Sequence, residues 1–174
     1  GCRYSCVFCN QTAITGRAKR IPDKESVRSE IRKFLSYNNK GRRVMLAFYG
    51  GNFLGLAVDE IDLLLSVAED FVGKAKIQGI RFSTRPDTIT DETLKISAKY
   101  SVSEIELGVQ SMDDAVLELC RRGHRAADTE IAVGKLKAAG YSIGLQFMVG
   151  LPGQTGKSAM ETGRKICSLR PDFV

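Results

Sequence analysis

Short apolar runs alternate with amphipathic stretches along most of the chain. Four runs have the length of buried strands and end in glycine or polar residues: 43–49, 79–84, 103–109 and 141–149. A fifth run begins at 171–174. Between them, apolar side chains recur every three to four residues, which predicts helices over 22–37, 59–72, 91–100, 126–139 and 158–169. Strands that alternate with helices through short connections predict βαβ units, and hence an α/β domain with a parallel sheet.

Two helix boundaries have their own signals. Ser111 followed by Asp114 predicts a helix start, because a hydroxyl and a carboxylate can accept hydrogen bonds from the free N–H groups of a first turn. Gly140 lies where a helix that ends near residue 139 would be capped, since glycine readily adopts a left-handed conformation.

One face of three predicted strands is polar. It carries Arg81, Ser83 and Arg85, then Glu104, Glu106 and Gln110, and then Gly144 and Gln146. A doubly wound sheet is covered by helices on both sides and is apolar on both. The pattern therefore favours a partly open barrel whose polar lumen holds a ligand. A buried ion pair, for example Arg81 with Glu106, is compatible with that lumen.

Length and composition limit the fold further. The chain has 174 residues, which is too short for a closed eight-fold β/α barrel of about 250 residues. No apolar stretch reaches the roughly 20 residues of a membrane span, and no signal peptide opens the chain, so we expect no membrane partner. A net charge of +6 permits an anionic partner without requiring one.

The cysteines are unevenly placed. Three of the five lie in the run Cys2-Arg3-Tyr4-Ser5-Cys6-Val7-Phe8-Cys9. A secreted disulfide framework would spread an even number along a smaller chain, so the pattern indicates a reducing, cytoplasmic compartment. Cys120 and Cys167 lie in helix-like stretches, where we expect small buried apolar residues.

Three thiolates so close in sequence can bind one soft-metal site. A zinc site usually needs a second pair of ligands, for which only His124 and Cys120 are candidates. The alternative is a four-iron cluster held by three cysteines, which leaves one iron open to another ligand.

The cysteine run resembles the signature of radical S-adenosylmethionine (radical SAM) enzymes, with Cys2, Cys6 and Cys9 as the cluster ligands. The resemblance implies a 4Fe–4S cluster whose open iron binds S-adenosylmethionine. It also implies reductive cleavage of that cofactor to a 5′-deoxyadenosyl radical, which abstracts hydrogen from a substrate. An electron donor such as flavodoxin or ferredoxin is implied with it.

Further motifs at the strand ends support this resemblance. Residues 49–53 (Tyr-Gly-Gly-Asn-Phe) resemble the family's Gly-Gly-Glu motif, which binds the methionine amino group. Residues 83–87, 108–111 and 121–124 resemble motifs of the elongator catalytic-subunit and oxygen-independent coproporphyrinogen oxidase branches. Residues 149–153 resemble a Gly-Leu-Pro-Gly turn near the adenine.

By this similarity Gln110 contacts the ribose or methionine part, Arg122 the carboxylate, Gln146 the ribose hydroxyls, and Phe8 the adenine. The full set of expected cofactor-binding residues is Phe8, Gly50, Gly51, Asn52, Ser83, Arg85, Gln110, Arg122, Gln146 and Val149. His124 is expected to be structural.

The second substrate is left open. Ser-Thr-Arg-Pro-Asp, Arg-Gly-His and Gly-Leu-Pro-Gly together resemble the elongator-like branch most, which makes tRNA a candidate substrate. Basic residues cluster at 16–20 and 40–43, although solvated loops are the simpler interpretation. Two alternatives remain: a coproporphyrinogen oxidase-like tetrapyrrole enzyme, and a zinc-stabilised binding module without catalysis.

The position of the motifs also changes the interpretation of length. The first cluster cysteine is residue 2, so the strand expected to deliver it would precede the chain. The resemblance covers nearly the whole chain and implies that residues 1–174 form one radical SAM core domain. We expect a partial (β/α)6 barrel, truncated at both ends.

Overall fold

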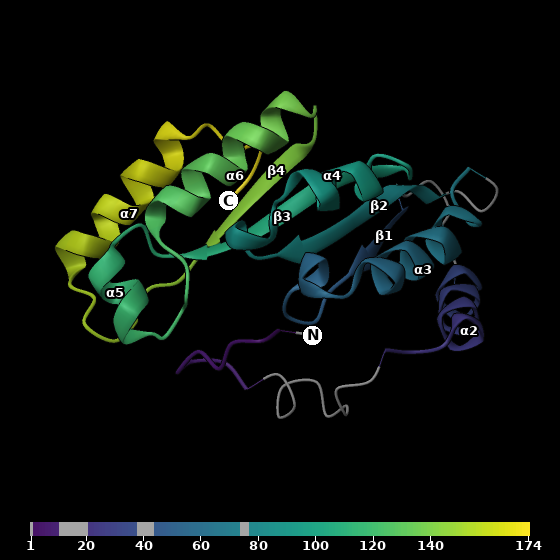
Figure 1. Ribbon diagram of the computed structural model, residues 1–174, viewed down its shortest axis with the longest axis horizontal. Coiled ribbons are helices and arrows are strands. Elements are labelled where there is room, and N and C mark those ends of the chain that lie inside the picture. Colours follow the sequence, from purple (N-terminus) through teal and green to yellow (C-terminus); the bar gives the residue numbers. More distant parts are fainter. Residues whose placement is uncertain (1, 11–20, 38–43, 74–76) are drawn as a thin grey trace.

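The computed structural model describes residues 2–10, 21–37, 44–73 and 77–174. Its centre is a parallel sheet in the order β1-β2-β3-β4, which confirms the predicted α/β architecture (Figure 1). The strands are β1 (Val44–Phe48), β2 (Ile77–Thr84), β3 (Val102–Gln110) and β4 (Ser142–Phe147). The first and last residues of each strand lie within two positions of those predicted from the sequence.

Helices alternate with the strands from β1 onward, as βαβ units require, and one further helix precedes β1. The helices are α2 (Lys24–Leu35), α3 (Val58–Glu69), α4 (Asp91–Ser97), α5 (Asp114–Leu119), α6 (Ala126–Ala138) and α7 (Gly156–Ser168). Short 3-10 turns, η1 (Phe53–Gly55) and η2 (Pro86–Thr88), follow β1 and β2. None of the helices in the described part of the chain is long and apolar enough to cross a membrane.

The two faces of the sheet differ as the pattern predicts. Ile105, Leu107 and Val109 of β3 are fully buried in the apolar core, where helices cover the sheet (Figure 1). On the opposite face, Arg81 forms ion pairs with Glu104 and Glu106. This confirms the expected pair between Arg81 and Glu106.

The predicted helix start near Ser111 and Asp114 is confirmed, since α5 begins at Asp114, but the capping group differs. Asp113 caps α5 by accepting hydrogen bonds from the N–H groups of Ala115 and Val116, whereas Asp114 accepts one from Ala126. The Ser111 hydroxyl instead accepts a hydrogen bond from the N–H of Asp113. The same buried hydroxyl lies 3.3 Å from the hydroxyl of Thr162 of α7.

The expected cap at Gly140 is confirmed, with φ 79° and a hydrogen bond from its N–H to the carbonyl of Lys137. Of the two isolated cysteines, Cys120 is buried as expected, but Cys167 is exposed on α7, so the prediction for Cys167 was wrong.

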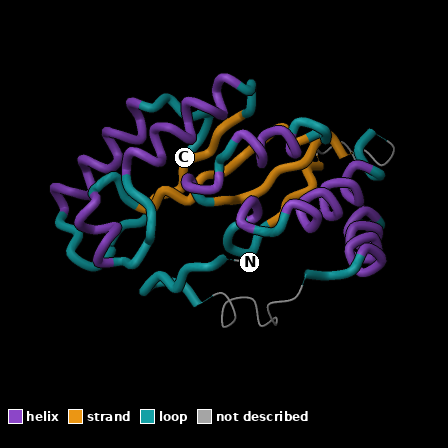
Figure 2. Tube along the Cα trace, viewed as in Figure 1, coloured by secondary structure: helices purple, strands orange, loops and turns teal. Residues whose placement is uncertain are grey.

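Both ends of the described chain lie against this sheet. Phe173 pairs in parallel with Gly144 of β4, as a fifth strand beginning there would. Residues 2–10 form a loop near the ends of the strands, drawn in teal in Figure 2. The two basic clusters at 16–20 and 40–43 lie outside the described residues.

Candidate functional site

A cavity of about 240 Å³ lies between the N-terminal loop and the ends of the strands. Its walls come from Cys2, Tyr4, Cys6, Phe8, Cys9, Tyr49, Gly50, Gly51, Ser83, Thr84, Gly108, Gln110, Arg122 and Gln146. The three cysteines of the predicted cluster therefore share one cavity with most of the predicted cofactor-binding residues.

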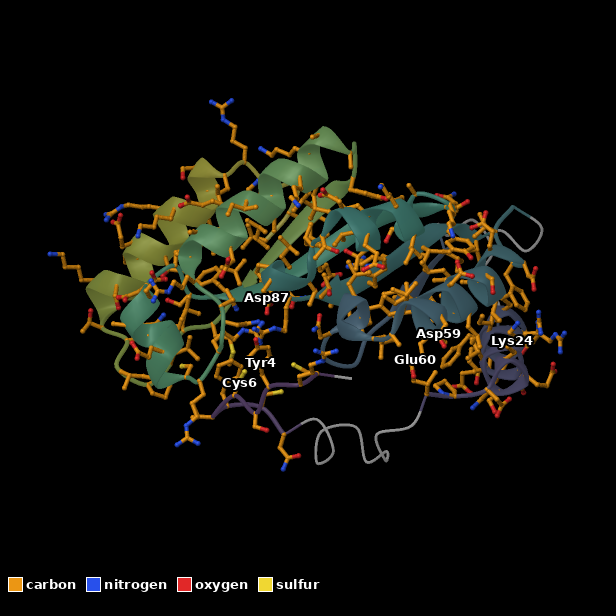
Figure 3. The ribbon with its side chains drawn as sticks, in the orientation of Figure 1. Tyr4, Cys6, Lys24, Asp59, Glu60 and Asp87 are labelled. Carbon is orange, nitrogen blue, oxygen red and sulfur yellow. The ribbon has the colours of Figure 1, made fainter. Side chains whose placement is uncertain are left out.

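The N-terminal loop is tied to the segment that follows α5. The N–H of Val7 donates a hydrogen bond to the carbonyl of Cys120, and the N–H of Cys9 donates one to the carbonyl of Cys6 within the loop. Cys6 is buried, and Figure 3 shows it beside Tyr4 below the strand ends, with Asp87 nearby. The Tyr4 ring stacks under the guanidinium of Arg85, 3.9 Å from its centre.

All three cysteines of the N-terminal loop line the cavity. In the part of the chain that the structure describes, no three His, Cys, Asp or Glu side chains are grouped so that they could hold one metal ion. A four-iron cluster binds each thiolate on a different iron, so its ligands surround the cluster and do not converge on a point. Three thiol donors around one cavity suit such a cluster.

Arg122 connects the cysteine loop to β3. Its side chain is buried, its Nη2 donates to the carbonyl of Gly108 at 2.5 Å, and its Nη1 lies 3.6 Å from Cys6 Sγ. The buried Nε has no partner among the described residues. A guanidinium with an unused donor at a cavity is suited to bind a carboxylate.

Glycines bring the backbone close to the cavity. Gly50 and Gly51 follow β1 with φ of 131° and 104°, a conformation that side chains disfavour. At Gly108 an added Cβ would lie 2.9 Å from the Gln110 amide and 3.0 Å from Arg122. The absence of side chains at these positions keeps the cavity open.

Gln110 turns the chain at the end of β3. It adopts a left-handed conformation, with φ 67°, although it is not a glycine. Its carbonyl accepts a hydrogen bond from the N–H of Met148, which holds the end of β4 beside it. This strained backbone places the Gln110 side chain in the cavity wall.

A buried carboxylate lies behind the cavity wall. Glu106 accepts hydrogen bonds from the Tyr49 hydroxyl at 2.7 Å and from the Ser83 hydroxyl at 3.2 Å. The Gln146 amide nitrogen also donates to it, and Arg81 pairs with it. The polar lumen therefore contains a connected network that spans β1 to β4.

Three predicted contact residues do not line the cavity. Asn52 is buried, and its Oδ1 accepts hydrogen bonds from the Thr84 hydroxyl and the Arg85 N–H. Arg85 is fully buried and forms a two-point ion pair with Asp87. Val149 is largely exposed on the loop after β4. Their contacts with a cofactor stay predictions.

His124 is buried next to Arg122 and Arg85, and neither ring nitrogen has a partner among the described residues. Burial, and then the two cationic arginines, lower the pKa of His124 to about 4. The imidazole is therefore neutral at pH 7. At Cys120, burial and the nearby Cys6 thiol raise the pKa of the thiol.

Sequence reasoning missed four lining residues: Tyr4, Tyr49, Thr84 and Gly108. Each lies inside a motif whose other residues are predicted to bind the cluster or the cofactor. Position within the motif was a usable signal for Gly108, since it lies on the polar face with Glu106. Tyr4 had no such signal, because only the folded loop brings it to Arg85.

Comparison with known proteins gives one family. The model of the radical SAM superfamily matches residues 1–166. A heme chaperone, HemW, from Lactococcus lactis is 26% identical over 99% of this chain and 45% of its own length. A tRNA uridine(34) acetyltransferase from Dehalococcoides mccartyi is 25% identical over 95% of this chain and 42% of its own length. The chain thus spans about half the length of these curated relatives.

Solved structures share the fold. Methylornithine synthase (PylB) superposes with a TM-score of 0.78 at 15% identity, over 99% of this chain and 50% of that one. The archaeal Elp3 of Methanocaldococcus infernus gives 0.70 at 24% identity, over 86% of this chain and 39% of that one. The cysteine-lined cavity, the parallel sheet and the match over residues 1–166 agree: this chain belongs to the radical SAM superfamily and carries its enzyme core.

Proposed function

We propose that the chain holds a 4Fe–4S cluster on Cys2, Cys6 and Cys9 and binds S-adenosylmethionine in the adjoining cavity. The observation that carries the proposal is that the three thiols share one cavity with Gly50, Gly51 and the strand-end side chains. When bound, the cluster and cofactor would supply reductive cleavage to a 5′-deoxyadenosyl radical, which takes hydrogen from a second substrate.

The residues present fit these groups. Three thiolates can bind three irons, which leaves the fourth for the cofactor. Arg122 has a buried, unpartnered Nε at the cavity and suits the methionine carboxylate. The open backbone at Gly50 and Gly51 suits the methionine amino group, because no Cβ lies in the way.

The remaining lining residues suit the ribose and the adenine of S-adenosylmethionine. Ser83, Gln110 and Gln146 offer polar atoms for the ribose. Phe8 lines the cavity and offers an apolar surface for the adenine ring. In this arrangement the chain orients the cofactor between the cysteine loop and the strand ends.

Anaerobic reconstitution with iron and sulfide tests the proposal. We expect a brown protein that, with dithionite and S-adenosylmethionine, releases 5′-deoxyadenosine. Cys9→Ala should abolish both colour and product, whereas Cys167→Ala should keep both, because Cys167 is exposed on α7. A colourless protein that binds one zinc ion would instead establish the zinc-stabilised module.

An electron donor such as flavodoxin or ferredoxin would take the place of dithionite in the cell. Replacing dithionite with a reduced flavodoxin in the same assay should sustain 5′-deoxyadenosine release. The coproporphyrinogen oxidase-like alternative predicts that the product assay responds to an added porphyrinogen, and an unchanged rate would count against it.

For the second substrate we propose tRNA, because a relative similar over 95% of this chain is named a tRNA uridine(34) acetyltransferase. The net charge of +6 is compatible with a polyanion. We expect filter binding of tRNA that weakens steeply between about 50 and 200 mM salt. The absence of measurable binding at low salt would remove this proposal and leave the cofactor site unaffected.

A further inference from the structure

Glu106 of β3 lies behind the cavity and does not line it, yet three side chains that do line it bond to its carboxylate. These are Tyr49 after β1, Ser83 of β2 and Gln146 of β4. Glu106 is only 4% exposed, and Arg81 pairs with it from the same polar face. One buried carboxylate therefore contacts three parts of the cavity wall.

A carboxylate only accepts hydrogen bonds, so each partner must direct a donor at it. Tyr49 and Ser83 each have a single hydroxyl hydrogen, and both hydroxyls bond to Glu106. Gln146 uses its amide nitrogen, which fixes the orientation of the amide. No other described residue donates to the Gln146 amide oxygen.

What remains for a ligand are acceptors. The hydroxyl oxygens of Tyr49 and Ser83 keep lone pairs, and Gln146 keeps its amide oxygen. Such a wall is complementary to a group that donates hydrogen bonds. The hydrogen-bond donors of S-adenosylmethionine are its ammonium, its ribose hydroxyls and the exocyclic amino group of its adenine. The ammonium is assigned above to Gly50 and Gly51 and the adenine to Phe8, which leaves the ribose hydroxyls for this wall.

We propose that Glu106 is a positioning residue that makes this wall an acceptor subsite for the ribose hydroxyls of S-adenosylmethionine. The inference rests on the proposed function of the cavity. With its amide nitrogen bonded to Glu106, Gln146 presents its amide oxygen to the cavity as an acceptor. An aspartate at this position would also offer an acceptor, but it would place a second carboxylate next to Glu106. Two opposed carboxylates there would repel each other, because Arg81 already serves both Glu104 and Glu106.

The test measures anaerobic equilibrium binding to the reconstituted holoprotein without reductant, so that no turnover occurs. The probes are S-adenosylmethionine and its 2′-deoxyribose and 3′-deoxyribose analogues. We expect the wild-type protein to bind the natural cofactor about tenfold more tightly than at least one analogue, the value of one hydrogen bond of ordinary strength. In Glu106→Gln this preference should fall to within about twofold, because the Gln146 amide is then free to turn.

The matched control is Glu104→Gln. Glu104 lies on the same strand and face and pairs with the same Arg81, but among the described residues no side-chain hydrogen bond joins it to a lining residue. Its preference for the natural ribose should stay as in the wild type. Equal losses for the natural cofactor and both analogues in Glu106→Gln would overturn the inference and assign Glu106 to folding alone.

A reciprocal exchange gives a second readout. Gln146→Glu alone should weaken cofactor binding by about tenfold or more, because it opposes two carboxylates. In the double variant Glu106→Gln with Gln146→Glu, the amide lies at position 106 and the carboxylate at position 146, so one again donates to the other. The preference for the natural ribose should then recover. Failure to recover overturns the inference. A wild-type holoprotein that binds no S-adenosylmethionine overturns the proposed function itself, which is a distinct result.

Discussion

Arg122 Nη1 lies 3.6 Å from Cys6 Sγ, within hydrogen-bond distance for sulfur, although 116 positions separate the two residues. The same guanidinium donates to the carbonyl of Gly108 on β3. If Cys6 binds the proposed cluster, a cationic donor beside its sulfur would favour the more negative, reduced state, because it stabilises charge on the sulfur. Arg122 is therefore suited both to bind a carboxylate and to adjust the potential of the cluster.

Arg122→Gln should make the reconstituted cluster harder to reduce. We expect its midpoint potential to become more negative by about 60 mV, which corresponds to about 1.4 kcal/mol for one electron. A potentiometric titration followed by electron paramagnetic resonance, without S-adenosylmethionine, isolates this effect from cofactor binding. Arg121→Gln is the control, since Arg121 is exposed. Equal potentials in both variants would contradict the role of the contact.

His124 should make stability depend on pH. Its pKa is lowered to about 4 by burial and then by Arg122 and Arg85, whereas an unfolded histidine titrates near 6.5. Between these values the unfolded chain binds more protons, so stability is complete above pH 6.5 and falls as pH decreases toward 4. The loss is about 3 kcal/mol at most.

Urea unfolding of wild type and His124→Gln between pH 7 and pH 4.5 measures this contribution. The variant cannot titrate at this position, so its unfolding free energy should fall less steeply over the window. Parallel curves for the two proteins would show that His124 does not carry the dependence.

Two glycines should respond to alanine in opposite directions. An added Cβ at Gly144 would meet the Phe173 ring, whereas at Gly134 in α6 it would meet nothing. Gly144→Ala should lower the free energy of unfolding by about 1–3 kcal/mol through overpacking. Gly134→Ala should raise it by about 0.5–1 kcal/mol, because alanine loses less conformational entropy in a helix. Urea unfolding at pH 7 compares the two variants, and stabilisation by Gly144→Ala would contradict the packing of Phe173.

Asn52 should act mainly on stability. Its Oδ1 accepts hydrogen bonds from Thr84, from the Arg85 N–H and from Thr88, so Asn52→Ala leaves buried donors unsatisfied. We expect a loss of about 2–4 kcal/mol in unfolding free energy. Asn52→Asp keeps an acceptor at this position and should lose less. If Asn52→Ala instead weakens S-adenosylmethionine binding at unchanged stability, the residue contacts the cofactor directly.

The secondary structure was largely predictable because it depends on local periodicity. The alternation at 103–110 separates buried Ile105 and Leu107 from Glu104 and Glu106, and the sheet keeps that separation. Local capping was less predictable. Asp113 replaced Ser111 at the start of α5 because the Ser111 hydroxyl meets Thr162 of α7, a contact made only after folding.

The site was predictable where residues act through their type and spacing. The cysteine spacing and the strand-end glycines are enough to indicate the cavity wall from the amino-acid sequence alone. Asn52 and Arg85 belong to the same motifs, but their side chains face inward to Thr84 and Asp87. The direction of a side chain at a strand end depends on the turn that follows, here η1 and η2, and motif similarity does not specify it.

The amino-acid sequence by itself determined the parallel α/β units, the polar lumen face and the thiol set, because periodicity and ligand chemistry are properties of the chain. Only the tertiary structure decided which polar groups meet. Tyr49, Ser83 and Gln146 reach one carboxylate because parallel pairing brings β2, β3 and β4 into register and the Tyr49 ring extends across from the end of β1. Because Glu106 is buried, its carboxylate needs hydrogen-bond donors, and these three side chains supply them. A buried carboxylate without such partners would be costly in free energy.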